Sequence, residues 1–354
     1  MTSDAPHNPW QRTRRVLRLA IPSAGEMLLG MLVGLVNTYL VGHLGAASLT
    51  AVGLGVQVSM AAMVLFSAVG TGATAVTARM IGAEDVKGAN RVVSQSVLIA
   101  FGCGLLSSFL LVTFAEPAMV LMGATGESLT QGVLYLRIIC IVFPVSSMIF
   151  VGGACLRGAG DTRTPLLVMA VVNVFNIIVA WVLVEGIGPF PALGVEGAAY
   201  GSAISRFLGG LIIFALLLKG RSGLRLRWRG LDRETMWRIL RVGLPASLDQ
   251  LIFRAGSLVW IRIVASLGTV AFAAHQIVLN GESISFMPGW GFAVAATTLV
   301  GQGLGARDHL RAEKDALLAF YISAVFMSLM GVVFFLFPAQ IVGLFTDDAN
   351  VIAM

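Results

Sequence analysis

The chain has 354 residues, of which 57% are hydrophobic and only 12% are charged, and its formal net charge is +6. A soluble domain carries about 25% charged residues, so this composition excludes a water-soluble protein of this size. Apolar stretches of about 18 residues or more recur along the whole length. Each could cross a hydrocarbon core of ~30 Å, which predicts an all-α polytopic membrane protein. The cysteines Cys103, Cys140 and Cys155 show no CxxC spacing and predict no metal site.

Nine apolar stretches are predicted to form membrane-spanning helices. In chain order they cover residues 16–41, 48–78, 92–115, 129–153, 165–185, 193–218, 239–266, 270–302 and 313–337. Lysine and arginine gather in every second connection, which by the positive-inside rule places the N-terminus in the cytoplasm. The expected domains are a cytoplasmic tail (1–15), a lobe of six helices (16–218), a basic cytoplasmic linker (219–238) and a partial second lobe of three helices (239–354).

The second half of the chain resembles the first. RVLRLAIPS at 15–23 matches RILRVGLPA at 238–246, and the same shift of 223 residues places RMIGAED at 79–85 over QGLGARD at 302–308. Six spans separate the copies, so both enter the membrane in the same direction, which predicts parallel repeats with a cavity between two lobes. Because the first unit ends near residue 219, a complete copy would end near 219 + 223 = 442. We therefore expect the second lobe to lack three of its six helices.

Five motifs, spread in order over residues 15–348, are similar to those of a known family. They are IPSAGEMLLGMLVGLVNTYLVGHLGAASLTAVGL, LRGAGDTRTP, LGVEGAAYGSAISR, AAHQI and FMPGWGFAVAATTLVGQGLGA. On these motifs the chain resembles the multidrug and toxic compound extrusion (MATE) family of efflux transporters, with a C-terminal truncation. The resemblance implies a two-lobe bundle of twelve helices, nine of them present here. It also implies export of organic cations in antiport with Na+ or H+, without a cofactor or an enzymatic activity.

The resemblance further implies a location and a set of partners. We expect a multi-pass protein of the plasma (bacterial inner) membrane that contacts small organic cations and lipids, binds no nucleic acid, and is a monomer when complete. A truncated chain would be a dimer or a remnant that does not transport. Another alternative, a flippase for lipid-linked or anionic amphipathic substrates, is favoured by Arg254 and Arg262 within an apolar run. No HExxH or GxSxG motif stands at the end of a span, which argues against a membrane enzyme.

Ionisable side chains at membrane depth are costly and usually face a cavity. Glu26 and Asp249 occupy equivalent positions in the two repeats, four residues after a proline, and are predicted to bind a cation or a proton. The alternative is that they are solvated or paired with arginines near the cytoplasmic entrance. Glu282 is predicted to bind a substrate cation or a proton, unless it makes a structural hydrogen bond. Phe286 and Met287 would form an adaptable apolar wall beside it.

Asn37, in LVNTYLVGHLG, departs from the pattern of the family. The resemblance implies an aspartate that takes part in ion coupling at this position in many members, and an asparagine cannot titrate. Asn37 could still bind Na+ through its amide oxygen, or form hydrogen bonds with Asn173 and Asn176, which share one helix face. A packing role, worth about 0.6 kcal/mol for each hydrogen bond between helices, is the alternative.

Four arginines, at positions 137, 206, 254 and 262, and one histidine also fall within apolar runs. Arg254 and Arg262 are predicted to form internal ion pairs with Glu282, Asp249 or Glu26, although they could instead attract an anionic substrate. His275 and Gln276, in AAHQI, are predicted to be hydrogen-bonded packing residues rather than a proton relay.

The stretch CLRGAGDTRTP concentrates charge between two apolar runs. It lacks the GK[ST] of a phosphate-binding loop, so we expect a turn between two helices on the cytoplasmic side. Gly158 and Gly160 would allow the turn, Asp161 would clamp an arginine such as Arg163, and Pro165 suits the first turn of the next helix. The pairs Gly30–Gly34 and Gly301–Gly305 have the spacing that allows two helices to approach closely.

Overall fold

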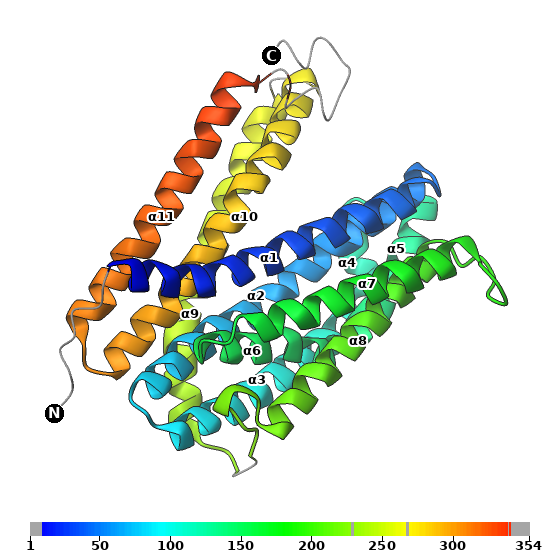
Figure 1. The fold of residues 1–354 in the computed structure, drawn as a ribbon. Coiled ribbons are helices and arrows are strands. Elements are labelled where there is room, and N and C mark those ends of the chain that lie inside the picture. Colours follow the sequence, from blue (N-terminus) through cyan, green and yellow to red (C-terminus); the bar gives the residue numbers. More distant parts are fainter. Residues whose placement is uncertain (1–8, 228–229, 267–268, 339, 341–354) are drawn as a thin grey trace.

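The computed structural model describes residues 9–227, 230–266, 269–338 and 340, and these residues form an assembly of long helices (Figure 1). In chain order the elements are α1 (Pro9–Gly42), α2 (Ala46–Gly82), α3 (Val86–Thr113), α4 (Ala115–Leu121), α5 (Gly126–Ile141), α6 (Phe143–Gly158), α7 (Arg163–Glu185), α8 (Val195–Lys219), the 3-10 turn η1 (Arg221–Gly223), α9 (Arg233–Ser266), α10 (Thr269–Gly305) and α11 (His309–Leu336). The expected all-α architecture is confirmed.

The fourth predicted span, 129–153, is not one continuous helix. It is divided into α5 and α6, which meet at Val142 with a bend of 58°. Pro144 lies in the first turn of α6 and cannot donate a backbone hydrogen bond to the preceding turn, so the helix breaks just before it. The predicted span is therefore a bent pair of helices rather than one straight helix.

Seven helices of the described chain are long and apolar enough to cross a membrane, or eight if the bent pair α5–α6 counts as one span. α9 is as long as α1, at 34 residues, but it is not among them. Asp249, Arg254 and Arg262 interrupt its apolar stretch and lower its hydropathy. The seventh predicted span is therefore helical, yet more polar than the others.

The turns that follow α2 and α10 confirm the internal repeat. Glu84 and Arg307, which are 223 positions apart, both have a left-handed backbone, with φ of 58° and 59°. The next residues, Asp85 and Asp308, cap α3 and α11: each side chain accepts a hydrogen bond from the backbone three residues later, at 2.8 and 2.9 Å. The same local geometry therefore occurs twice.

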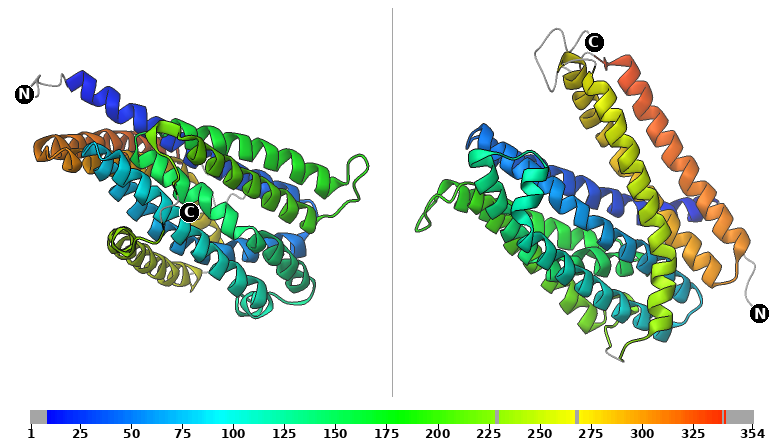
Figure 2. Two further views of the ribbon diagram at one scale, coloured as in Figure 1. Left: turned by 90° about the horizontal axis from the view of Figure 1, so that it is seen from below. Right: turned by 180° about the vertical axis from the view of Figure 1, so that it is seen from behind.

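Each repeat packs its helices against the other repeat. α1 lies on α10, and α2 lies on α9, so each of the first two helices contacts the counterpart of the other (Figures 1 and 2). These contacts are close because glycines face backbone atoms: a Cβ on Gly243 would overlap the carbonyl oxygen of Ala68, and a Cβ on Gly291 would lie 2.5 Å from the nitrogen of Ala24. The first two helices of each repeat thus pack directly against those of the other repeat.

The C-terminal ends of α2 and α10 meet in a glycine seam, formed by Gly82 and Gly305 and the backbones that they face. A Cβ on Gly82 would overlap the carbonyl oxygen of Gln302, and a Cβ on Gly305 would overlap that of Arg79. Because 79 and 302, like 82 and 305, differ by 223, the two contacts are related by the repeat. From the seam towards their N-terminal ends, α2 and α10 diverge. There α10 and α11 lean away from α1, α7 and α8 (Figure 1).

The two predicted small-residue pairs have different surroundings. Gly301 fits closely in the seam region, since a Cβ there would lie 2.6 Å from the Cβ of Ala78. A Cβ added to Gly30 or Gly34 would have no atom within 4 Å, so nothing in the described part of the chain packs closely on them. The prediction of close approach holds only for the second pair.

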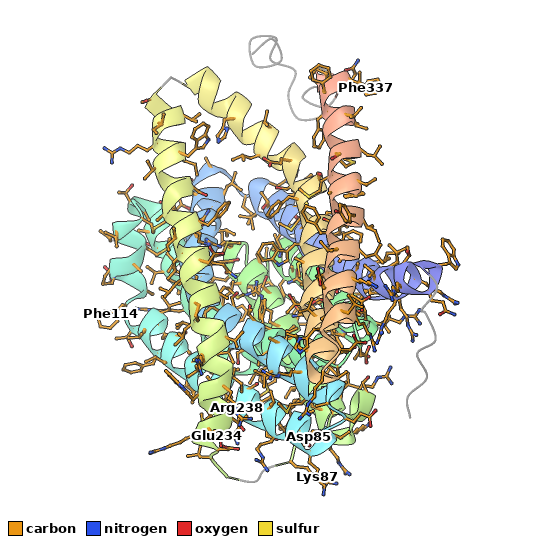
Figure 3. All side chains as sticks on the ribbon, turned by 90° about the vertical axis from the view of Figure 1, so that its left-hand side faces the viewer. Asp85, Lys87, Phe114, Glu234, Arg238 and Phe337 are labelled. Atoms are coloured by element: carbon orange, nitrogen blue, oxygen red, sulfur yellow. The ribbon has the colours of Figure 1, made fainter. Side chains whose placement is uncertain are left out.

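The linker between the repeats is held on α3. Asn90, Ser94 and Gln95 form hydrogen bonds of 2.6–3.3 Å with its backbone, at Arg225, Arg227, Gly230 and Asp232. Figure 3 shows Asp85 and Lys87 at the same end of the molecule as Glu234 and Arg238, whereas Phe337 lies at the opposite end. The linker, the α2–α3 turn and the glycine seam therefore share the charged end of the molecule, which we call the linker side.

Candidate functional site

A cavity of about 620 Å³ lies between the two repeats. Its wall is formed by α1, α2, α5, α6, α8, α9 and α10. On α2 the lining residues run from 56 to 74, and on α10 from 290 to 297, so they all precede the glycine seam at the ends of these helices. The seam closes the cavity on the linker side. The volume lies within the range of sites that bind drug-sized molecules.

Most of the cavity wall is apolar and adaptable. Aromatic and methionine side chains from several helices line it: Met27, Met60, Met63, Phe66, Tyr135, Phe150 and Trp290. The rings of Phe66 and Phe150 stack with centroids 6.4 Å apart. Methionine is flexible and polarizable, so a wall of this kind accepts molecules of different shapes.

Four charged side chains of the described chain also line the cavity: Arg157, Arg206, Asp249 and Arg254. Arg157 is the only one of the four that forms an ion pair with a described residue. The predicted internal ion pairs of Arg254 and Arg262 are therefore wrong for the part of the chain that is described. Arg254 faces the cavity, and Arg262, two turns further along α9, is not part of the wall.

Arg157 is paired with Glu26. One guanidinium nitrogen, Nη1, donates to both carboxylate oxygens of Glu26, at 2.8 and 3.0 Å. The two side chains are only 12% and 11% exposed, and their contact joins α6 to α1. Glu26 and Asp249 occupy equivalent positions in the repeats but have different surroundings. Glu26 is held in an ion pair, as the alternative interpretation has it, while Asp249 faces the cavity.

The three asparagines are placed along α1 and α7. Asn173 donates a hydrogen bond to the carbonyl of Leu29 at 3.0 Å, and Asn176 donates one to Ser202 at 3.2 Å. The side-chain oxygens of Asn37 and Asn176 are buried and have no hydrogen-bond partner among the described residues. Both oxygens are therefore free to accept a ligand. A ligand would give each of them a partner, and buried polar atoms without partners are uncommon in proteins.

Glu282, Phe286 and Met287 lie outside the cavity. Glu282 and Phe286 are exposed, and the ring of Phe286 contacts Trp290, which is the first residue of α10 in the cavity wall. The reason is the divergence of the helices: the part of α10 before Trp290 extends away from α1 and α2 (Figure 1). The structure separates these three residues from the cavity in which sequence reasoning placed them.

The AAHQI motif lies in the first half of α10. The ring of His275 is near that of Trp260 on α9, with centroids 6.3 Å apart in an edge-on arrangement. Its Nε2 is buried and has no hydrogen-bond partner within the described chain, so the predicted hydrogen-bonded role is not seen. The side chain of Gln276 lies outside the described residues.

The LRGAGDTRTP stretch forms a tight turn between α6 and α7, as predicted. Gly160 has a φ of 89°, and a Cβ on Gly158 would lie 2.6 Å from the carbonyl oxygen of Thr74. Asp161 clamps the next helix by accepting hydrogen bonds from the backbone and hydroxyl of Thr164, at 3.0 and 2.7 Å. Pro165 lies in the first turn of α7, which begins at Arg163.

The arginine that Asp161 clamps is Arg221 of η1, at 3.7 Å, and not Arg163. Ser222 also donates a hydrogen bond to Asp161. On its other side the turn contacts α10, because Gln302 donates to the carbonyl of Gly158 at 3.3 Å. The turn therefore ties the linker and the second repeat to the first, and it belongs to the closed, linker side of the cavity.

Acid is expected to loosen this turn. Partial burial alone would raise the pKa of Asp161, but hydrogen bonds from Ser222 and Thr164 and the Arg221 guanidinium outweigh it and hold the pKa below its ordinary 3.8. A lowered folded-state pKa gives stability that is complete above about pH 4 and is lost as the pH falls through the folded-state pKa. The Tm in detergent should therefore fall more steeply below about pH 4 in the wild type than in Asp161→Asn. Equal slopes would rule out this role.

The comparisons with known proteins agree with this geometry. The family model MatE matches residues 22–182 and 245–354, which is more than half of the chain. The chain belongs to the MatE family. Over 344 residues it is 34% identical to the probable multidrug resistance protein NorM of Thermotoga maritima, covering 96% of this chain and 73% of that protein.

Solved structures show the same fold for this MatE protein. A multidrug resistance MATE family transporter of the MOP superfamily, in an outward-facing conformation, matches with a TM-score of 0.89 and 29% identity, covering 96% of this chain and 76% of the other. A MOP superfamily transporter from Pyrococcus furiosus, for which a reverse polarity of the binding pocket suggests a different function, matches with a TM-score of 0.88, the same identity and the same coverages. The two-lobe helical fold and the family of multidrug efflux transporters are thereby confirmed.

The sequence does not predict two residues of the cavity wall, Arg206 and Arg157. Arg206 was visible only as a charge within the sixth apolar run, and nothing in the sequence indicated that it faces the cavity. The signal that could have marked Arg206 is the free-energy cost of an arginine at membrane depth. Such an arginine usually faces water, a partner or a ligand. Arg157 belongs to the stretch CLRGAGDTRTP, which the sequence predicts as a turn, yet it lies at the end of α6, lines the cavity and pairs with Glu26.

Proposed function

We propose that this MatE protein is a secondary active exporter, which binds amphipathic small molecules in the central cavity and releases them outward in antiport with Na+ or H+. The observation that carries the proposal is a cavity of drug-sized volume between the two repeats, beyond which the ends of α2 and α10 pack closely at the glycine seam on the linker side. The positive-inside rule assigns the linker side to the cytoplasm. On that assignment the structure is an outward-open state in the plasma (bacterial inner) membrane, with its N-terminus in the cytoplasm.

Loading from the cytoplasm requires the seam to open while the other end of the cavity closes. The seam is suited to this movement because glycine and backbone surfaces, rather than interdigitated side chains, meet at Gly82 and Gly305. Interfaces of this kind have two discrete packings, and bound cargo and ions shift the balance between them.

The coupling ion has two candidate sites. Na+ prefers oxygen ligands, and the unpartnered oxygens of Asn37 and Asn176 could provide them. A proton could instead bind Asp249, the one carboxylate among the described residues of the cavity wall. The resemblance implies organic cations as cargo, whereas three of the four charged side chains in the wall are arginines.

Transport in proteoliposomes tests the proposal. The protein is reconstituted and supplied with rhodamine 6G or fluorescein, and an inward Na+ or H+ gradient is imposed in turn. Dye movement that requires one of the gradients is the expected result. With Na+, Asn176→Leu should abolish the dependence, while Thr38→Val should keep it, since among the described residues that hydroxyl bonds to the carbonyl of Gly34 in its own helix. With H+, Asp249→Asn should abolish it. Gradient-independent leakage for both dyes would refute active export.

A further inference from the structure

The charges around the cavity do not balance. Glu26 neutralises Arg157 through their buried ion pair, which leaves Arg206 and Arg254 against a single carboxylate, Asp249. The described wall therefore carries an excess of one positive charge. A low-dielectric wall focuses such a field onto any molecule that enters the cavity.

Burial shows which of the remaining charges lacks a partner. Asp249 and Arg254 on α9 are exposed, so water can solvate both of them. Arg206 on α8 is half-buried, lines the cavity together with Tyr135, and forms no ion pair with any described residue. A half-buried charge is costly unless an opposite charge compensates it. The group that requires a partner in this wall is a guanidinium.

The surroundings of Arg206 suit one kind of molecule. A guanidinium binds carboxylate, sulfonate and phosphate groups with two parallel hydrogen bonds, which an ammonium cannot do. The remaining wall, including Met63, Phe150 and Trp290, is apolar and aromatic. Arg254 adds a second positive charge from the other repeat.

We propose that the cargo of this exporter is an amphipathic organic anion, whose acidic group binds Arg206 and whose aromatic body lies against the methionine and aromatic wall. The proposal rests on the export function proposed above and names its substrate class. An organic cation would share the cavity with two arginines and one carboxylate, and like charges repel each other strongly in a weakly polar site.

A matched pair of dyes tests the substrate class. Fluorescein is anionic and rhodamine 6G is cationic, and both have a xanthene ring system of similar size. Equilibrium titration of the purified protein in detergent should give at least about tenfold tighter binding of fluorescein. Raising the salt concentration should weaken this binding, since part of the attraction is electrostatic.

Variants assign the preference to Arg206. Arg206→Gln should weaken fluorescein binding about tenfold or more, whereas Arg206→Lys, which keeps the charge but loses the fork, should retain an intermediate affinity. Arg262→Gln is the control, because it removes an arginine of α9 that does not line the cavity, and its affinity should equal that of the wild type. If Arg206→Gln does not fold, Arg254→Gln provides the same comparison with a smaller expected loss.

The outcomes separate the two proposals. Fluorescein binding that depends on Arg206, without gradient-driven transport, would support the substrate class and overturn the exporter. Gradient-driven transport of rhodamine 6G that improves in Arg206→Gln would keep the exporter and overturn the substrate class. Absence of binding for both dyes would overturn the substrate class as well.

Discussion

Gly82→Leu is expected to abolish transport. The first atom of the new side chain would overlap the carbonyl oxygen of Gln302, and a backbone cannot move aside as a flexible side chain does. Overpacking of this kind costs about 1–3 kcal/mol or more, and here the whole cost falls on the state in which the seam is closed. The population should shift towards states with an open linker side. Dye transport in proteoliposomes and the Tm in detergent measure the two effects.

The repeat and a second glycine provide controls for this variant. Gly305→Leu should have the same effect, because its Cβ would overlap the carbonyl of Arg79 in the equivalent contact. Gly53→Leu is on the same helix as Gly82, is exposed, and has no atom within 4 Å of its added Cβ, so it should retain transport. Wild-type transport and Tm in Gly82→Leu would mean that the seam does not close the cavity.

Glu26→Gln is expected to destabilise the protein by about 3–5 kcal/mol, since it leaves the Arg157 guanidinium buried without a counter-charge. Both side chains are only 11–12% exposed, so little water can replace the lost partner. The variant removes the ion pair between α1 and α6 and leaves the positive charge of Arg157 uncompensated in the cavity wall. Chemical denaturation in detergent, followed by circular dichroism, measures the change in stability.

A double-mutant cycle separates pairing from general damage. Glu26→Gln combined with Arg157→Gln should be less destabilised than the sum of the single variants, because no uncompensated charge remains. The surface pair Glu234–Arg238, with side chains 75% and 56% exposed, is the matched control, and Glu234→Gln should cost less than about 1 kcal/mol. Equal losses at Glu26 and Glu234 would show that the buried pair has no special role.

The sequence by itself determined the fold class and the repeat. A continuous apolar run long enough to cross a bilayer forms a helix there, because a helix satisfies its backbone hydrogen bonds within the segment. The shift of 223 residues is visible in the letters, and it correctly related the turn at Glu84 to that at Arg307 and the glycine at 82 to that at 305. Local rules were sufficient for these features.

Only the tertiary structure decided which charges meet. Glu26 and Arg157 are 131 residues apart, and Asp161 pairs with Arg221 rather than with its neighbour Arg163. The composition of the cavity wall depends on the angle at which α10 diverges from α1, which excludes Glu282 and admits Trp290. Pairing and orientation are set by how the two repeats pack against each other, and this packing is a property of the assembled helices that no single apolar run encodes.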